Sequence, residues 1–191
     1  MNNQKVRDFF NSVAITYKHD DSIAIDELLD SLKLEKIPRI LDLGCGKGII
    51  SDKLLKRNNG EVIAIDLSDK MIELAKEANP KSKVKFINAD FYEFSDEKPF
   101  DMIICFDAFP HFLDVESFVR KAASLIKKDG QLIIAHDIGR AQLNEHHHAH
   151  AMGVSRPLKD PIIEAKSFEK YFDVIIANEG DNYYHIFLKR K

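Results

Sequence analysis

Short apolar runs alternate with amphipathic stretches of helical length from Pro38 onward. Apolar segments of strand length that are separated by helices are typical of parallel strands with helices on both faces of the sheet. The alternation therefore predicts a doubly wound, mostly parallel α/β sheet. The predicted strands span residues 39–43, 61–65, 83–87, 100–105 and 131–136.

The segments on either side of this core carry other patterns. Residues 1–37 have apolar side chains at helical spacing, which predicts an N-terminal cover of two helices. Residues 138–162 break the alternation with several histidines and are interpreted as an inserted lid. Residues 163–191 predict a last helix near 164–171, followed by an antiparallel hairpin.

We expect the whole chain, residues 1–191, to fold as one domain. At 191 residues and 45% apolar composition it has the size of one α/β domain and buries a substantial core. Residues 38–137 would form a Rossmann-like core, with seven strands once the hairpin is included. In this arrangement Lys128-Asp129-Gly130 ends a helix of residues 115–126 and leads into the strand at 131–136.

Composition argues against several classes of protein. The net charge is −3, and no basic run resembles a nucleic-acid footprint. The two cysteines, Cys45 and Cys105, suit a reducing compartment better than a disulfide framework. No stretch approaches the roughly 18 apolar residues of a membrane span, and the start lacks a signal-peptide core. We expect a soluble, cytoplasmic protein that is a monomer or a homodimer.

The first predicted strand leads into a turn with three glycines at alternate positions, Gly44, Gly46 and Gly48. Glycine supplies turn conformations and a close approach of backbone to ligand that a Cβ would block. Asp42 precedes the turn, and Asp66 ends the next predicted strand. A glycine turn followed by an acid about twenty residues later predicts a ligand site.

A nicotinamide-binding domain also has a strand, a glycine turn and a later acid. In that fingerprint the third glycine follows the second by three residues, so that a helix terminus meets a pyrophosphate. The spacing differs here, and the carboxylate of Asp42 would repel a pyrophosphate but suit a cationic ammonium. A nicotinamide enzyme is therefore the weaker alternative.

Five consecutive segments resemble the class I S-adenosylmethionine-dependent methyltransferases, in particular those that act on small molecules. The likeness extends over residues 38–136 in order and with ordinary spacing. The segments are Leu41–Gly48, Val62–Ser68, Phe86–Phe91, Phe100–Cys105 and Leu125–Leu132.

The resemblance implies roles at the donor site. The glycines would lie against the methionine part of S-adenosylmethionine, with Asp42 near its ammonium. Asp66 would accept both ribose hydroxyls, because a carboxylate has two acceptor oxygens; helix capping is its alternative role. Cys45 is expected to serve packing and turn geometry.

Further residues are implied at the adenine and at the reacting end. Leu67 would pack on the adenine, and Asp90 with the Phe91 backbone would bind its amino edge, although an acid after a strand is also common in turns. Tyr17 resembles a tyrosine that closes over the donor, or else it is a core aromatic. Cys105 and Phe106 would lie where donor and acceptor meet.

Methyl transfer from a sulfonium is an in-line displacement, so the protein mainly aligns the acceptor, excludes water and handles one proton. Candidates for handling this proton lie at the carboxyl end of the predicted sheet: Asp107, His111, His136 and Asp137. The family often has a histidine at the place of His111, where a structural hydrogen bond is as reasonable as catalysis.

A histidine cluster follows the fifth predicted strand: His146, His147, His148 and His150. If the segment is helical, His146 and His150, or His147 and His150, could share a face as metal ligands do. A divalent metal there would lower the pKa of the acceptor and orient it. Acid/base or hydrogen-bonding work by His146, His147 and His150, and no direct role, are the alternatives.

The sequence also bears on the acceptor. The Asn/Asp-Pro-Pro-aromatic sequence of nucleic-acid amino methyltransferases is absent, as is the Pro-Cys nucleophile of cytosine C5 methylation. A small-molecule acceptor is therefore favoured. A protein or RNA methyltransferase is one alternative, and a non-catalytic module that binds S-adenosylmethionine or S-adenosylhomocysteine is another.

Overall fold

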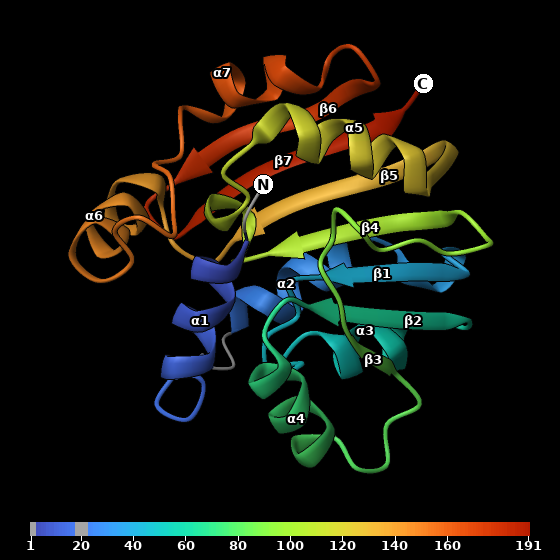
Figure 1. Cartoon of the computed structure of the whole chain (residues 1–191). Coiled ribbons are helices and arrows are strands. Elements are labelled where there is room, and N and C mark those ends of the chain that lie inside the picture. Colours follow the sequence, from blue (N-terminus) through green and yellow to red (C-terminus); the bar gives the residue numbers. More distant parts are fainter. Residues whose placement is uncertain (1–2, 18–22) are drawn as a thin grey trace. The chain divides into compact units, whose positions relative to one another are not determined.

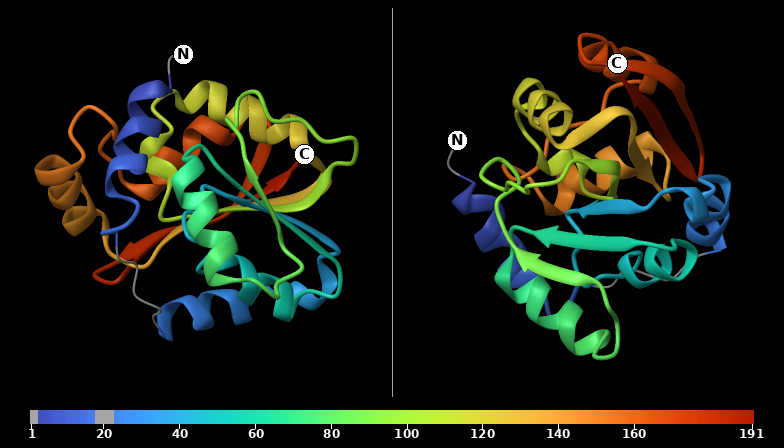
Figure 2. Two further views of the ribbon diagram at one scale, coloured as in Figure 1. Left: turned by 60° about the horizontal axis from the view of Figure 1, so that its bottom comes forward. Right: turned by 90° about the vertical axis from the view of Figure 1, so that its right-hand side faces the viewer.

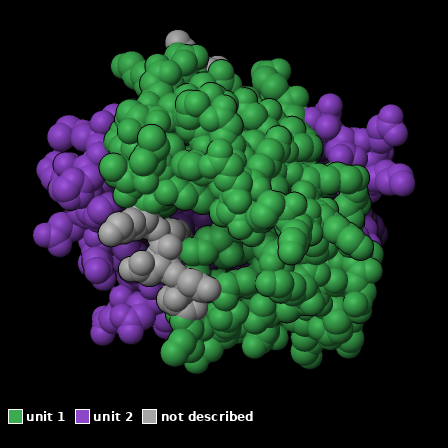
Figure 3. Space-filling view, turned by 90° about the horizontal axis from the view of Figure 1, so that it is seen from below, with its two compact units in different colours: residues 1–94 green, residues 95–191 purple. Residues whose placement is uncertain are grey.

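A computed structural model of the chain describes residues 3–17 and 23–191 (Figure 1). The chain divides into two compact units, Met1–Phe94 and Ser95–Lys191, which are distinguished by colour in Figure 3. The described residues form seven strands, in the order β3-β2-β1 within the first unit and β4-β5-β7-β6 within the second. The predicted number of strands is thus confirmed.

The first unit contains three parallel strands, β1 (Arg39–Leu43), β2 (Glu61–Asp66) and β3 (Lys85–Asn88). Leu41 lies opposite Ile63, and Ala64 lies opposite Phe86. The strands run in one direction, so their carboxyl ends, at Leu43, Asp66 and Asn88, share one edge.

Helices α1 (Gln4–Val13), α2 (Ile23–Ser31), α3 (Ser51–Arg57) and α4 (Asp69–Ala78) complete this unit, with a 3₁₀ turn η1 (Leu34–Lys36). The two helices predicted before the sheet are confirmed in the described residues. Ser68 caps α4 as expected, since its side chain accepts a hydrogen bond from the Met71 nitrogen. Helix α1 packs against α4 (Figure 2).

The second unit contains β4 (Phe100–Phe106), β5 (Ile126–His136), β6 (Phe172–Gly180) and β7 (Tyr183–Arg190). β4 and β5 are parallel, whereas β7 runs antiparallel to both β5 and β6. The predicted C-terminal hairpin is therefore confirmed. The other elements are α5 (Val115–Leu125), α6 (Arg140–His150), α7 (Pro161–Ala165), η2 (Phe109–His111) and η3 (Lys166–Phe168).

Aromatic side chains hold the short elements of the second unit together. The ring of Phe109, from η2, lies 5.0 Å from that of Phe118 in α5 and 6.0 Å from that of Phe168 in η3. All three residues are fully buried. Burial of a phenylalanine side chain stabilises a fold by about 1.5–3 kcal/mol, so this cluster fixes the position of η2.

Three predicted elements differ from the structure by two residues or more at a boundary. β5 begins at Ile126, so Lys128-Asp129-Gly130 lies inside a strand and does not precede one. The expected helix at 164–171 is instead α7 followed by η3, because Pro161 can open a helix and Asp160 caps it. β3 begins and ends later than residues 83–87.

No helix within the described ranges has the length and apolarity to cross a membrane. The single-domain organisation and the boundaries of the core and the lid stay predictions.

Candidate functional sites

The glycine turn joins β1 to α3 and lies against the end of β2. Gly44, Gly46 and Gly48 have φ values of 74°, 52° and 77°, a backbone region that favours glycine. The backbone nitrogens of Gly44 and Cys45 donate hydrogen bonds to the Ile65 carbonyl at 2.9 and 3.0 Å. A Cβ built on Gly46 would have no atom within 4 Å, so the backbone there borders open space.

Asp66 links this turn to the start of α4. Its Oδ2 accepts a hydrogen bond from the Gly46 nitrogen at 2.9 Å, and its Oδ1 accepts one from the Ser68 nitrogen at 2.8 Å. Burial raises the pKa of Asp66 to about 6, against the opposing effect of these two bonds. Each carboxylate oxygen has a second lone pair, so the group retains acceptor capacity for a ligand.

Asp42 is fully buried beneath the turn. Its Oδ2 accepts a hydrogen bond from the Ser51 hydroxyl at 2.6 Å. Burial raises the pKa of Asp42 to about 7. A cation nearby would lower that pKa and favour the carboxylate, as the expected ammonium of a ligand would do. Burial also raises the pKa of the Cys45 thiol, which suits a packing role.

Asp90 begins the loop that follows β3. Its Oδ1 accepts a hydrogen bond from the Tyr92 nitrogen at 2.9 Å, and its Oδ2 accepts one from the Asn3 amide at 2.8 Å. Phe91 is buried beside Tyr92, with ring centroids 5.6 Å apart. Asp90 therefore shapes its own turn, as its alternative interpretation suggested, and its proposed contact with adenine stays a prediction.

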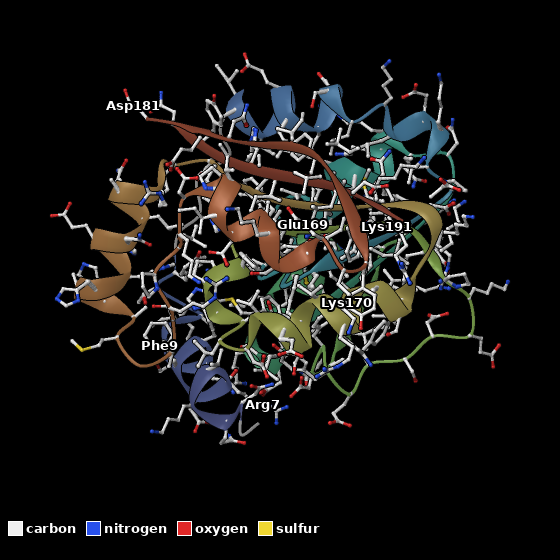
Figure 4. The ribbon with its side chains drawn as sticks, turned by 90° about the horizontal axis from the view of Figure 1, so that it is seen from above. Arg7, Phe9, Glu169, Lys170, Asp181 and Lys191 are labelled. Atoms are coloured by element: carbon white, nitrogen blue, oxygen red, sulfur yellow. The ribbon has the colours of Figure 1, made fainter. Side chains whose placement is uncertain are left out.

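Sequence reasoning missed a polar stripe on α1 and at its N-cap, formed by Asn3, Arg7 and Asn11. Besides the contact of Asn3, Arg7 Nε donates to the carbonyl of Leu67 at 3.2 Å, and the Asn11 amide donates to Asp69 at 2.8 Å. Figure 4 shows Arg7 on this helix. The spacing of four residues, which places side chains on one helix face, was the available signal.

Tyr17 lies just beyond α1, with its ring 6.5 Å from that of Phe10. Its carbonyl accepts a hydrogen bond from Lys47 Nζ at 2.6 Å, so the segment is tied to the glycine turn. Apart from Cys105 and Phe106, the residues expected at the donor therefore lie in the first unit, on the turn, the strand ends and the segment after α1. Their individual roles stay predictions.

In the second unit, the expected residues begin at the end of β4. Cys105 and Phe106 are buried there. Asp107 follows in a left-handed conformation with a φ of 50°, which is uncommon for a residue other than glycine. Its Oδ1 lies 3.1 Å from His136 Nδ1 and 3.3 Å from the Asp137 nitrogen, which donates to it.

His111 is held by the segment that follows α6. Its Nδ1 lies 3.0 Å from the Val154 carbonyl, which can only accept a hydrogen bond. Nδ1 therefore carries the proton in the neutral ring, and Nε2 is left as an acceptor. Burial lowers the pKa of His111 to about 4, with a smaller opposite effect of the Val154 contact.

The histidines of α6 divide into one buried and three exposed residues. His147 is buried and its ring lies 5.0 Å from that of His111. His146, His148 and His150 are exposed, and the rings of His146 and His150 lie 4.9 Å apart. The predicted helical spacing of His146 and His150 is confirmed. The other predicted pair, His147 and His150, does not share one exposed face, because His147 is buried and His150 is exposed. Within residues 3–17 and 23–191, no three His, Cys, Asp or Glu side chains are arranged to hold a metal ion.

The β6–β7 hairpin positions the start of α6. The Gly139 nitrogen donates to the Asp181 carbonyl at 2.9 Å, at the hairpin turn that Figure 4 labels. A Cβ at Gly139 would lie 2.5 Å from the Gly180 oxygen, so only glycine fits. Arg140 pairs with Glu179 at 2.9 Å. The site of His147 is thus fixed by contacts far from it in sequence.

Together, a glycine turn, an acid at the end of β2 and a mixed seven-stranded sheet define a protein with a Rossmann-like fold. Comparison with known sequences then indicates the protein family. The family described as "Methyltransferase domain" matches residues 41–134. Residues 41–134 thus form a methyltransferase domain, and the predicted fold, that of the class I S-adenosylmethionine-dependent methyltransferases, is confirmed.

Two curated relatives are named as O-methyltransferases. The chain is 34% identical over 66% of its length to a ubiquinone biosynthesis O-methyltransferase of Pelagibacter ubique, of which it covers 53%. It is 32% identical over 71% of its length to a malonyl-[acyl-carrier protein] O-methyltransferase of Priestia megaterium, of which it covers 52%. The chain thus spans about half the length of these relatives.

Solved structures extend the likeness of the fold to the whole chain. The magnesium protoporphyrin IX methyltransferase of Synechocystis, with bound S-adenosylhomocysteine, superimposes with a TM-score of 0.72 and 18% identity, and each chain is covered completely. An N-methyltransferase of Bradyrhizobium japonicum, in complex with the same product, gives a TM-score of 0.70 and 14% identity over 95% of this chain and 98% of that chain.

Proposed function

We propose that the protein binds S-adenosylmethionine and transfers its methyl group to an oxygen of a small-molecule acceptor. The observation that carries the donor assignment is Asp66, whose two oxygens hold the glycine turn and the start of α4 while keeping free lone pairs. The relatives named as O-methyltransferases support an oxygen acceptor.

The residues of the first unit fit this donor. The open space at Gly46 leaves room for a ligand against the backbone, and Asp66 offers acceptors for a ribose diol. Asp42, which is buried with a raised pKa, would become fully ionised beside an ammonium group. Leu67, Asp90 and Phe91 would complete the adenine side.

S-adenosylmethionine supplies a methyl group on a positively charged sulfur, which leaves as a neutral thioether. The protein must therefore orient the acceptor, exclude water and take up one proton. We assign the acceptor side to the polar residues of the second unit, namely Asp107, His111, His136 and His147, with Cys105 and Phe106 at the adjoining strand end.

A divalent metal would be held by His146 and His150. Two imidazoles one helical turn apart are a common start of a metal site, and their rings lie 4.9 Å apart. Both residues are exposed, so an acceptor with a chelating group would have to supply further ligands. The metal would then acidify and orient the acceptor.

Calorimetry with S-adenosylhomocysteine tests the donor assignment. The wild-type protein should bind it, and Asp66→Ala should reduce the affinity by at least about tenfold, the effect of losing more than about 1.4 kcal/mol. Glu61→Gln, at the other end of β2, is the matched control and should bind normally. Unchanged affinity of Asp66→Ala would reject the assignment. Binding without methyl transfer to any acceptor of a phenol and carboxylic-acid panel would favour a non-catalytic module.

A further inference from the structure

The second unit contains a cavity beside the start of α5. Its volume is about 520 Å³, within the range of about 300–1,000 Å³ that is usual for small-molecule sites. Three segments border it, namely the residues that lead into α5, the loop between α6 and α7, and the stretch from α7 to η3. The residues expected at the donor and at the acceptor do not line it. The cavity is therefore a separate feature of this unit.

A buried ion pair between Arg156 and Glu164 lies at the cavity. Arg156 Nη1 is 3.1 Å from Glu164 Oε2, and the Glu164 side chain is 1% exposed. The Arg156 guanidinium also lies over the ring of Phe109, 4.5 Å from its centroid. Burial of two charges is costly, and apolar residues in their place are often as stable. Stability is therefore a weak explanation for this pair, and a role in binding is a better one.

The backbone of Lys159 is held on both sides by buried groups. Its nitrogen donates to Glu164 Oε2 at 3.0 Å, and its carbonyl accepts a hydrogen bond from the fully buried Tyr184 hydroxyl at 3.2 Å. The side chain of Asn144 fixes the preceding Leu158 through bonds to its nitrogen and its carbonyl, at 2.8 and 3.0 Å. The Lys159 side chain, in contrast, is exposed at the cavity. A firmly held segment thus presents this positive charge.

Unused hydrogen-bond donors outnumber unused acceptors at the cavity. Of its two acids, Glu164 is bound as described, and Asp114 accepts hydrogen bonds from the Ser117 nitrogen at 3.0 Å and hydroxyl at 2.7 Å. Within residues 3–17 and 23–191, neither the Lys159 ammonium nor the Ser167 hydroxyl has a hydrogen bond or an ion pair. Donors without acceptors point to a ligand that supplies acceptor atoms.

We propose that this cavity binds a small organic carboxylate with an apolar body. The carboxylate is bound by Lys159 and Ser167, since its two oxygens match two donors. The apolar body lies against Leu113, Val115 and Pro157, which complete the lining. A single unpaired ammonium suits one negative charge better than the two of a phosphate. This binding site goes beyond the proposed function, because it involves neither the donor residues nor the acceptor residues.

An NMR titration of the ¹⁵N-labelled full chain tests this site, with benzoate as the probe. Benzoate should cause saturable shifts in the amide signals of Leu113, Val115 and Lys159. Benzamide has nearly the same shape but no charge, and it should bind about tenfold more weakly, because hydrogen bonds between charged groups are stronger than neutral ones. Lys159→Gln should weaken benzoate binding by about tenfold and leave benzamide binding nearly unchanged.

Matched controls locate the probe. Lys166→Gln alters an exposed lysine that does not line the cavity and should bind benzoate as the wild type does. Saturation with S-adenosylhomocysteine should leave benzoate binding intact. Amide signals of Lys159→Gln away from the cavity should match those of the wild type and show that the variant is folded.

Four outcomes would overturn the proposal. They are the absence of saturable shifts, equal benzoate affinity of Lys159→Gln and wild type, equal affinity of the wild type for benzoate and benzamide, and loss of benzoate binding when S-adenosylhomocysteine is added. The last result would place the probe in the donor site and not in the cavity.

Discussion

The Oδ2 atom of Asp66 lies 2.9 Å from the backbone nitrogen of Gly46 and accepts its hydrogen bond. This contact joins the carboxyl end of β2 to a turn in which Gly46 has a positive φ. Asp66, which would bind the ribose of S-adenosylmethionine, thus also fixes the loop that would face the methionine part of the same molecule. Any change in the charge of Asp66 should therefore affect the whole donor site.

Affinity for S-adenosylhomocysteine should fall as the pH drops below about 6. Burial raises the pKa of Asp66 to about 6, so at lower pH the carboxyl is protonated and loses acceptor capacity. Calorimetry across this range should show a loss that approaches tenfold per pH unit. Asp66→Asn should bind weakly and lose the part of the pH dependence that Asp66 causes, while the part due to Asp42, whose pKa burial raises to about 7, should remain. A wild-type affinity that is constant from about pH 7 to about pH 5 would contradict this role.

The stripe on α1 should contribute to donor affinity without touching the donor. Arg7→Ala removes the bond to the Leu67 carbonyl, and Asn11→Ala removes the bonds to Asp69 and Ser68. A net hydrogen bond contributes about 0.5–1.5 kcal/mol, so each variant should bind S-adenosylhomocysteine about two- to tenfold more weakly. Asp8→Ala, which removes only an exposed bond to Gln4, serves as the control. Equal affinities in all three variants would show that α1 is only a structural cover.

His147 should make the stability of the protein depend on pH. Burial lowers its folded-state pKa to about 4, whereas an unfolded histidine titrates near about 6.5. The unfolded chain therefore binds the proton first, so stability from the neutral buried ring is present above about 6.5 and is lost as the pH falls toward about 4. Relative to wild type, His147→Gln should be less destabilising at about pH 5 than at about pH 7.5.

Urea unfolding at both pH values measures this difference. Other groups also titrate, and burial raises the folded-state pKa of Asp42 and Asp66, which acts in the opposite direction. The comparison is therefore between variant and wild type at each pH. His148→Gln should show the same effect at both values, because that side chain is exposed. A pH-independent effect of His147→Gln would exclude the buried neutral state.

Much of the fold was predictable from periodicity and turn chemistry. The strand at 39–43, the cap at Ser68 and the C-terminal hairpin follow from local patterns and agree with the structure. The start of β5 did not follow, because Lys127, Lys128 and Asp129 have a polar sequence typical of a turn. Ile126 pairs with Phe100, but the register then shifts so that Met102 lies opposite Gln131, and Asp129 between them has a φ of 64°. The polar residues therefore form a bulge inside β5, which a turn-like sequence does not distinguish from a turn that precedes a strand.

The candidate site was predictable only in part. The residues of the glycine turn and Asp66 could be named because spacing along the chain determines where they lie. The burial of His147 among its exposed neighbours could not, because it depends on the docking of α6 by Gly139 and Arg140. The helix has few apolar residues, so the sequence lacks the pattern that would show which of the four neighbouring histidines faces the core.

A divalent metal at His146 and His150 should be detectable independently of turnover. Titration of untagged, EDTA-treated protein with zinc should release heat of binding, because imidazole is a favoured zinc ligand. The double variant His146→Ala/His150→Ala should lose this heat, whereas His148→Ala should keep it. Elemental analysis after dialysis gives the stoichiometry. Equal zinc binding by the double variant and wild type would reject this pair as the site.

The docking of α6 should be sensitive to one methyl group. In Gly139→Ala the new Cβ would lie 2.5 Å from the Gly180 oxygen and 2.7 Å from the Asp181 oxygen, both backbone atoms of the hairpin. Such overpacking typically costs about 1–3 kcal/mol, which urea unfolding resolves. Ala141→Ser, at an exposed position of the same helix, should leave stability nearly unchanged. Because α6 carries His147, hydrogen exchange of the α6 amides should accelerate in Gly139→Ala. Unchanged exchange and stability would mean that the hairpin turn shifts freely and does not fix the helix.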